Sequence, residues 1–164
     1  MSQESAVTTG QSVVERFKGD LDRATNEVFS TMLGVGCEPV SAEAGTGGES
    51  LSAVIGLAGA LSGSLVLYTT SEAAMCMAEK MMGIAPAEVD EMVRDAIGEV
   101  CNMIAGAWKG FDPLLASGCL LSTPTIVSGS SYELFSQEAP IRIRKGYRFE
   151  KLTFTVTITC EPEG

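Results

Sequence analysis

A stretch without any charged residue, from Ser50 to Ser71, limits the possible folds of this chain more than any other feature. Its apolar part, LSAVIGLAGALSGSLVLY at 51–68, is long enough to cross a membrane as a helix. However, glycine and serine fall in its middle, and both ends alternate with a period of two. This pattern predicts two buried strands joined by a tight turn near 59–63, so we expect no membrane partner.

Helical periodicity comes before and after this pair of strands. Ser12 and Glu15 form a capping-box pattern, which predicts a helix that runs to about Leu33 and ends at Gly34. A short helix is expected after Thr70 or Ser71, ending at Gly83. A long helix is expected over 87–109.

The remainder of the chain, 114–129 and 139–161, has strand character. Between Leu152 and Cys160, apolar residues alternate with threonines, as in a half-buried antiparallel strand. The order of elements predicts an α+β fold, an antiparallel sheet with helices packed on one face. We expect residues 1–11 to form a disordered tail and 12–164 to form a single domain.

The formal net charge of −10 argues against a nucleic-acid partner. Basic residues cluster only in RIRKGYR at 142–148, where they alternate with isoleucine. This alternation favours a solvated strand face over a phosphate-binding patch.

Histidine is absent, which excludes Ser-His catalysis and most catalytic zinc sites. The five cysteines are scattered and odd in number, so we expect buried, reduced thiols rather than a disulfide framework. The first residues lack the basic and apolar regions of a signal peptide. Together these features predict a cytoplasmic protein.

The long helix has one apolar half and one unusual polar face. On a helical wheel, Asp95, Glu99 and Asn102 fall within an arc of about 60°. The wheel places three small residues beside them on this face: Gly98, Ala105 and Gly106. Each glycine costs about 1 kcal/mol of helix stability relative to alanine. Small residues around three polar ones predict a low platform that lets another backbone come close.

The opposite half is expected to pack on the core. The wheel gives this half ten residues: Met92, Val93, Ala96, Ile97, Val100, Cys101, Met103, Ile104, Ala107 and Trp108.

Other interpretations of the polar face stay open at this point. The glycines could equally serve close packing between helices, with Asp95 and Glu99 as edge charges. The two carboxylates could bind a metal, but without histidine the support is weak. A glycosidase-like acid pair has weaker support still.

The spacing of these residues resembles the signature of the CheC/CheX/FliY phosphatases of bacterial chemotaxis. That signature is Asp or Ser, three residues, Glu, two residues, Asn, twenty-one residues and Pro. This chain has Asp95, Glu99, Asn102, the twenty-one residues Met103 to Thr123, and Pro124. All four positions fit, and the full pattern is far more specific than Glu and Asn alone. The expected order of elements agrees over about 12–161.

The resemblance implies a protein-aspartate phosphatase that acts on a phosphorylated, CheY-type receiver domain. It implies that Asn102 orients the attacking water and that Glu99 pairs with a lysine of the receiver. Asp95, Gly98 and Gly106 are then expected to contact the partner. No cofactor of its own is implied, because the receiver holds the Mg²⁺ and the phosphoryl group.

A second copy of the signature is not evident, since Asp22 and Asn26 lack a matching glutamate. A single copy is similar to CheX, which implies a homodimer joined at sheet edges. The competing hypothesis is a non-catalytic binding or adaptor module related to flagellar-switch proteins. Fold alone cannot separate the two, whereas the pair Glu99 and Asn102 favours the enzyme.

Overall fold

The structure, a computed structural model, describes residues 3–42, 49–129 and 139–163. Within these residues, seven strands form one antiparallel sheet in the order β1-β6-β7-β3-β2-β4, and β5 also pairs with β2. The strands are β1 (Glu38–Val40), β2 (Ser50–Gly59), β3 (Leu61–Thr70), β4 (Cys119–Leu121), β5 (Thr125–Gly129), β6 (Ile141–Phe149) and β7 (Leu152–Pro162).

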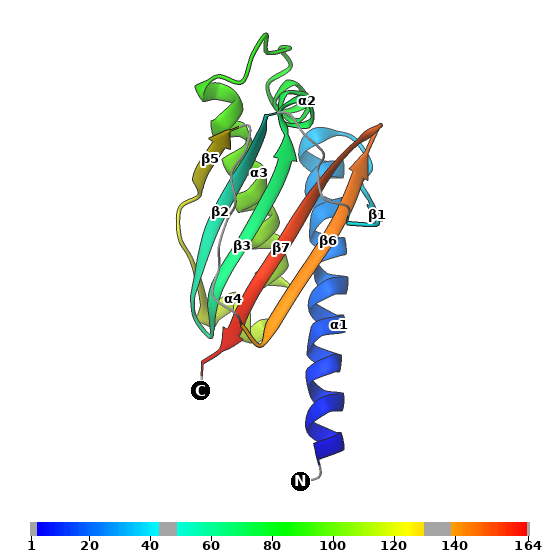
Figure 1. The fold of residues 1–164 in the computed structure, drawn as a ribbon, viewed down its shortest axis with the longest axis vertical. Helices are drawn as coiled ribbons and strands as arrows, with labels where there is room; N and C mark the ends of the chain where they lie inside the picture. The colour runs from blue at the N-terminus through cyan, green and yellow to red at the C-terminus, as the bar shows by residue number, and fades with distance from the viewer. Residues whose placement is uncertain (1–2, 43–48, 130–138, 164) are drawn as a thin grey trace.

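Helices cover one face of this sheet (Figure 1). They are α1 (Gln3–Val28), which continues as the π-helical turn η1 (Phe29–Leu33), then α2 (Ser71–Met82), α3 (Glu91–Gly110) and the short α4 (Pro113–Gly118). Helices α1 and α3 run along the sheet, and α2 lies near one end of it. The predicted α+β class, with helices on one face of an antiparallel sheet, is confirmed.

The uncharged stretch forms the hairpin of β2 and β3, as predicted. Only Ala60 separates the two strands. Two glycines of this hairpin let neighbouring segments come close to it. A β-carbon at Gly59 would lie 2.2 Å from the carbonyl oxygen of Gly118, and one at Gly63 would lie 1.9 Å from that of Thr159. Among the described residues, no helix is both long and apolar enough to cross a membrane.

The first helix starts earlier than predicted. Helix α1 begins at Gln3, nine residues before the predicted start at Ser12. The capping-box residues Ser12 and Glu15 lie inside this helix. No proline precedes Pro39, and a lone glycine weakens a helix without ending it. The predicted end is confirmed, because Gly34 adopts a left-handed φ of 72° after η1.

Side-chain caps set the other helix boundaries. Thr70 caps α2, and Asp90 caps α3 by accepting a hydrogen bond from the backbone N–H of Val93 at 3.0 Å. Helix α3 therefore begins at Glu91, four residues later than predicted. Asp112 caps α4, which occupies 113–118 within a segment expected to be strand-rich.

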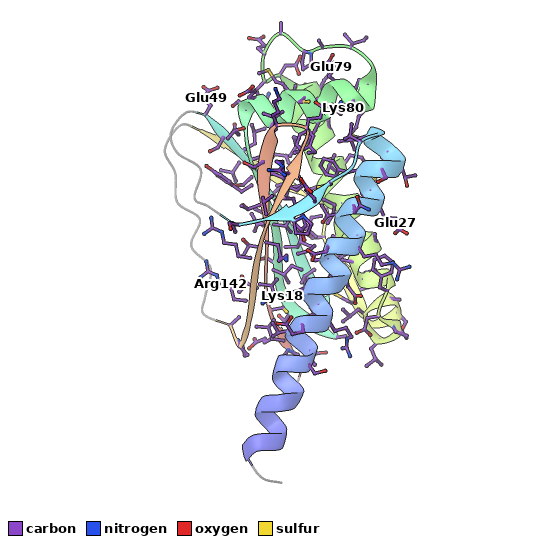
Figure 2. All side chains as sticks on the ribbon, turned by 90° about the vertical axis from the view of Figure 1, so that its right-hand side faces the viewer. Lys18, Glu27, Glu49, Glu79, Lys80 and Arg142 are labelled. Atoms are coloured by element: carbon purple, nitrogen blue, oxygen red, sulfur yellow. The ribbon has the colours of Figure 1, made fainter. Side chains whose placement is uncertain are left out.

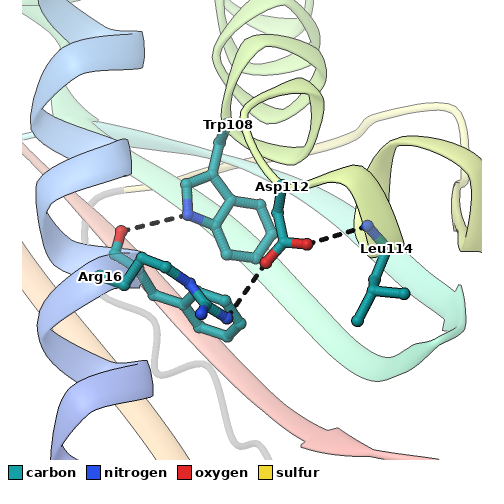
Figure 3. A network of polar contacts seen from close by, with 5 residues as sticks. Arg16, Trp108, Asp112 and Leu114 are labelled. Atoms are coloured by element: carbon teal, nitrogen blue, oxygen red, sulfur yellow. Dashed lines mark hydrogen bonds and ion pairs between the residues drawn. The ribbon is translucent and has the colours of Figure 1, made fainter.

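Aromatic contacts hold the helices on the sheet. The rings of Phe29 and Phe154 stack with their centroids 5.1 Å apart. On the neighbouring side, the Trp108 ring of α3 meets Phe17 of α1 edge-on at 5.2 Å. The Trp108 indole N–H also donates a hydrogen bond of 3.2 Å to the Phe17 carbonyl oxygen (Figure 3). These contacts fix the position of α3 relative to α1.

The basic cluster alternates as expected for a solvated strand face. Ile143 and Tyr147 are buried, whereas Arg142 and Arg144 are exposed on β6. Figure 2 shows Arg142 on the side of the sheet away from α1. The Lys145 ammonium lies 3.4 Å from the Asp22 carboxylate.

All five cysteines are free thiols, and four of them are buried. Burial raises the pKa of Cys37 and Cys101 to about 12 and that of Cys160 to about 11. The prediction of unpaired, mostly buried thiols is confirmed.

Candidate functional site

Helix α3 carries the candidate site on a strip that the core leaves free. Nine of its residues are buried and form the side that packs on the protein: Val93, Ala96, Ile97, Gly98, Val100, Cys101, Ile104, Ala105 and Trp108. The Cys101 thiol donates a weak hydrogen bond of 3.6 Å to the Ala53 carbonyl oxygen on β2. Because this side is tightly held, the position of the opposite strip is fixed.

Asp95, Glu99 and Asn102 are all exposed on that strip. Residues three and four positions apart on a helix are neighbours, so the three side chains lie in a row. In the described part of the chain, none of the three forms a hydrogen bond or an ion pair. Their carboxylate and amide groups are therefore available to an external partner.

Gly98 does not lie on an open platform as predicted. It is buried, and a β-carbon there would lie 3.3 Å from Cγ of Pro124 and 3.4 Å from Cδ1 of Ile126. The wheel could not show that Pro124 and β5 cover this side of α3. The fourth residue of the signature, Pro124, thus reaches the helix directly beside the exposed strip.

Ala105 is likewise buried, although the wheel placed it on the polar face. Gly106 fits the prediction better. It is half-buried, and a β-carbon there would meet no other atom within 4 Å. Bare backbone is therefore accessible between Asn102 and the end of the helix.

The prediction that Met92 packs on the core is wrong. The residue is 56% exposed. On the wheel it lies only about 20° from Glu99, so its place beside the polar row was a signal in the sequence. It adds an apolar contact to the same strip.

Neither a metal site nor a second signature is built into the described residues. No three carboxylate or thiol groups come together there in a way that could hold a metal ion. On α1, Asp22 accepts a hydrogen bond of 2.7 Å from the Tyr147 hydroxyl, and Asn26 accepts one of 3.3 Å from the Cys37 N–H. Both side chains therefore support the fold.

Comparison with known proteins connects this geometry to a family. A sequence model described as "Chemotaxis phosphatase CheX" matches residues 51–144, which include the whole row on α3 and Pro124. This chain belongs to the CheX family. The family resemblance noted from the spacing of Asp95, Glu99, Asn102 and Pro124 is thereby confirmed.

Individual members of the CheX family show the same likeness. The CheY-P phosphatase CheX of Thermotoga maritima is 36% identical over 89 residues, which are 54% of this chain and 57% of that protein. The match thus spans a little over half the length of this relative.

Solved structures share the fold. The crystal structure of the chemotaxis protein CheX from Vibrio vulnificus matches with a TM-score of 0.77 and 24% identity, covering 88% of this chain and 96% of that one. The CheX–CheY–BeF₃–Mg²⁺ complex from Borrelia burgdorferi matches with a TM-score of 0.71 and 20% identity, over 88% of this chain and 97% of that one.

Proposed function

We propose that this CheX-family protein hydrolyses the aspartyl phosphate of a CheY-type receiver domain. The observation that carries the proposal is the exposed pair Glu99 and Asn102, one helical turn apart on a firmly packed helix. The names of two relatives point the same way: one is a CheY-P phosphatase, and another was crystallised with CheY, BeF₃ and Mg²⁺.

The chemistry asks for positioning rather than for a strong base. An aspartyl phosphate is a reactive mixed anhydride, so holding a water in line with phosphorus accelerates its hydrolysis. The Asn102 amide has both a donor and an acceptor and does not titrate, so it can orient that water. This role requires an exposed amide without an internal partner, which is how Asn102 lies among the described residues.

In this proposal, Glu99 aligns the receiver with α3. Its carboxylate would form a charge-assisted hydrogen bond with a lysine of the receiver. Asp95, one turn earlier, would contact the partner or orient it. The receiver would hold the Mg²⁺ and the phosphoryl group, so this chain needs no cofactor of its own.

The docking surface would follow the exposed strip of α3. Gly106 would admit the receiver's backbone, and Met92 would contribute apolar area at the other end. Gly98, predicted as a direct contact, would act indirectly by seating Pro124.

We also propose a homodimer joined at sheet edges. The support is an incomplete edge: β1 pairs only with Gly146, Tyr147 and Arg148 of β6, so Ile141–Lys145 have no second neighbouring strand among the described residues. An unpaired strand edge can pair with a second copy around a twofold axis.

The test of the activity is the decay of a receiver charged with acetyl phosphate and Mg²⁺. We expect wild type to accelerate the decay and Asn102→Ala to lose activity on the order of a hundredfold with unchanged circular dichroism. Glu99→Ala should also lose activity, whereas Glu27→Ala, an exposed glutamate on α1 (Figure 2), should not. Equal decay rates with wild type and Asn102→Ala would refute the catalytic role. Receiver binding without faster decay would instead identify a non-catalytic adaptor.

A further inference from the structure

The edge of the sheet next to α3 contains a bulge between β4 and β5. Strand β2 pairs with β4 through 57–59 and with β5 through 50–54. Between these two ladders, residues 55–56 of β2 stand opposite residues 122–124, so the edge carries one extra residue. An extra residue of this kind bends the strand locally and re-aims the side chains that follow it.

Ser122 closes the ladder across this bulge. Its backbone N–H donates a hydrogen bond of 2.9 Å to the Gly56 carbonyl oxygen. Its hydroxyl oxygen accepts one of 2.7 Å from the Gly56 N–H, and the hydroxyl donates one of 3.1 Å to the Thr123 carbonyl oxygen. The Ser122 hydroxyl thus accepts the hydrogen bond that a backbone carbonyl would accept in a regular ladder, and it also donates one to the next peptide.

Gly56 leaves room for this arrangement. A β-carbon at Gly56 would lie 3.3 Å from the Ser122 hydroxyl oxygen, closer than an ordinary contact. The pair Gly56 and Ser122 is therefore matched: the glycine supplies both backbone partners and the space for the serine side chain.

The bulge places Pro124 against α3. Proline has no N–H, so it suits a position where the ladder is interrupted. Its Cγ lies 3.3 Å from the β-carbon position of Gly98, the residue before Glu99 and four residues before Asn102. Ile126, two residues further on, meets the same glycine at 3.4 Å.

We propose that Ser122 is a positioning residue for the Glu99–Asn102 pair. Its hydroxyl sets the bulge that lays Pro124 on Gly98, and this contact fixes where the exposed strip of α3 stands beside the docked receiver. The proposal rests on the phosphatase function proposed above. It predicts an effect on the chemical step, because a small displacement of a positioned group lowers turnover.

The test compares kcat and KM for the phosphorylated receiver in four variants. Ser122→Ala removes the hydroxyl, and Gly56→Ala crowds it without changing Ser122. Ser122→Thr keeps a hydroxyl and is the rescue variant. Ser128→Ala is the matched control, since Ser128 is an exposed serine on β5 whose hydroxyl makes no hydrogen bond within the described part of the chain.

We expect Ser122→Ala and Gly56→Ala to lower kcat about tenfold with KM within about twofold of wild type. Ser122→Thr and Ser128→Ala should keep kcat within about twofold of wild type. In an Asn102→Ala background, adding Ser122→Ala should cause a smaller further loss than it causes in wild type, because one of the two groups that the serine positions is already gone.

Full kcat in Ser122→Ala would overturn the proposal, provided that faster amide exchange at Gly56 shows that the hydrogen bond is lost. A loss in kcat that Ser122→Thr fails to restore would also overturn it. Failure of the phosphatase function gives a different result, since Asn102→Ala would then be as active as wild type.

Discussion

Pro124 lies against the backbone of Gly98, with its Cγ 3.3 Å from the point that a β-carbon would occupy. These two residues are far apart in the chain, yet they form the border of the exposed strip on α3. The glycine thus has a packing role, whereas Gly106, with no atom within 4 Å of its β-carbon position, leaves open surface. Two glycines in one helix therefore serve different purposes.

This difference predicts opposite results for two alanine substitutions. Gly106→Ala should raise the free energy of unfolding by about 0.5–1 kcal/mol, since alanine favours the helix and meets nothing. Gly98→Ala should gain less or lose stability, because its methyl group presses on Pro124. Urea unfolding of both variants measures this. An equal gain at both positions would contradict the contact.

Met92 provides a test of the docking surface. Met92→Ser should raise KM for the phosphorylated receiver roughly fivefold, equivalent to about 1 kcal/mol of binding, with little change in kcat. Met32→Ser is the matched control, because Met32 is 49% exposed but lies on η1. If both substitutions leave KM unchanged, the receiver does not reach this end of α3.

Asp112 ties α4 to α1, and its two bonds should differ in strength (Figure 3). Its carboxylate accepts a hydrogen bond of 2.9 Å from the Leu114 N–H and pairs with Arg16 at 3.1 Å. Asp112→Ala should cost about 1–2 kcal/mol through the lost cap. Arg16→Ala should cost less than about 1 kcal/mol, because the arginine side chain is 55% exposed.

Asp112→Asn is the control for this prediction, since its amide oxygen can still cap α4. We expect its stability to lie near that of Arg16→Ala. Thermal unfolding in low and high salt separates the two contributions, as only the ion pair is screened. A larger loss in Arg16→Ala than in Asp112→Ala would reverse the assignment.

Buried thiols should make the fold less stable in alkali. The thiols of the unfolded chain ionise near their ordinary pKa of 9.0, whereas burial raises the pKa of Cys37 and Cys101 to about 12 in the folded chain. The contribution of these thiols to the free energy of unfolding is therefore fully present below about pH 8, and it is lost as the pH rises through 9 toward 12. Each such thiol lowers the free energy of unfolding by up to about 1.4 kcal/mol per pH unit.

Urea unfolding between pH 8 and 10 checks this slope. Cys101→Ala removes one of the thiols, so its stability should fall less steeply with pH than that of wild type, whatever its absolute value. Parallel slopes for the two proteins would show that Cys101 ionises alike in both states.

Local patterns predicted the elements that depend on local chemistry. The alternation of the uncharged stretch predicted the β2–β3 hairpin, and Gly34 and Thr70 marked helix boundaries that the structure confirms. The wheel also placed Asp95, Glu99 and Asn102 on one exposed face, because a fixed angle per residue is all that this prediction needs.

Features that depend on distant parts of the chain could not be predicted in this way. A wheel cannot show which strand lies over a helix, so it misplaced Gly98 and Ala105, which are both buried. Helix α4 was missed because six residues are too few for helical periodicity to stand out, although Asp112 and Pro113 form a cap pattern.

The packing of α3 has a consequence for the thermodynamics of recognition. With Trp108 bonded to Phe17 and one side of the helix enclosed, this protein has little conformational freedom to lose when a complex forms. In the proposed complex with a receiver, most of the ordering entropy would then come from the receiver's own loops. Two receivers with the same contact residues would bind with different affinity if one already held those loops in the bound conformation.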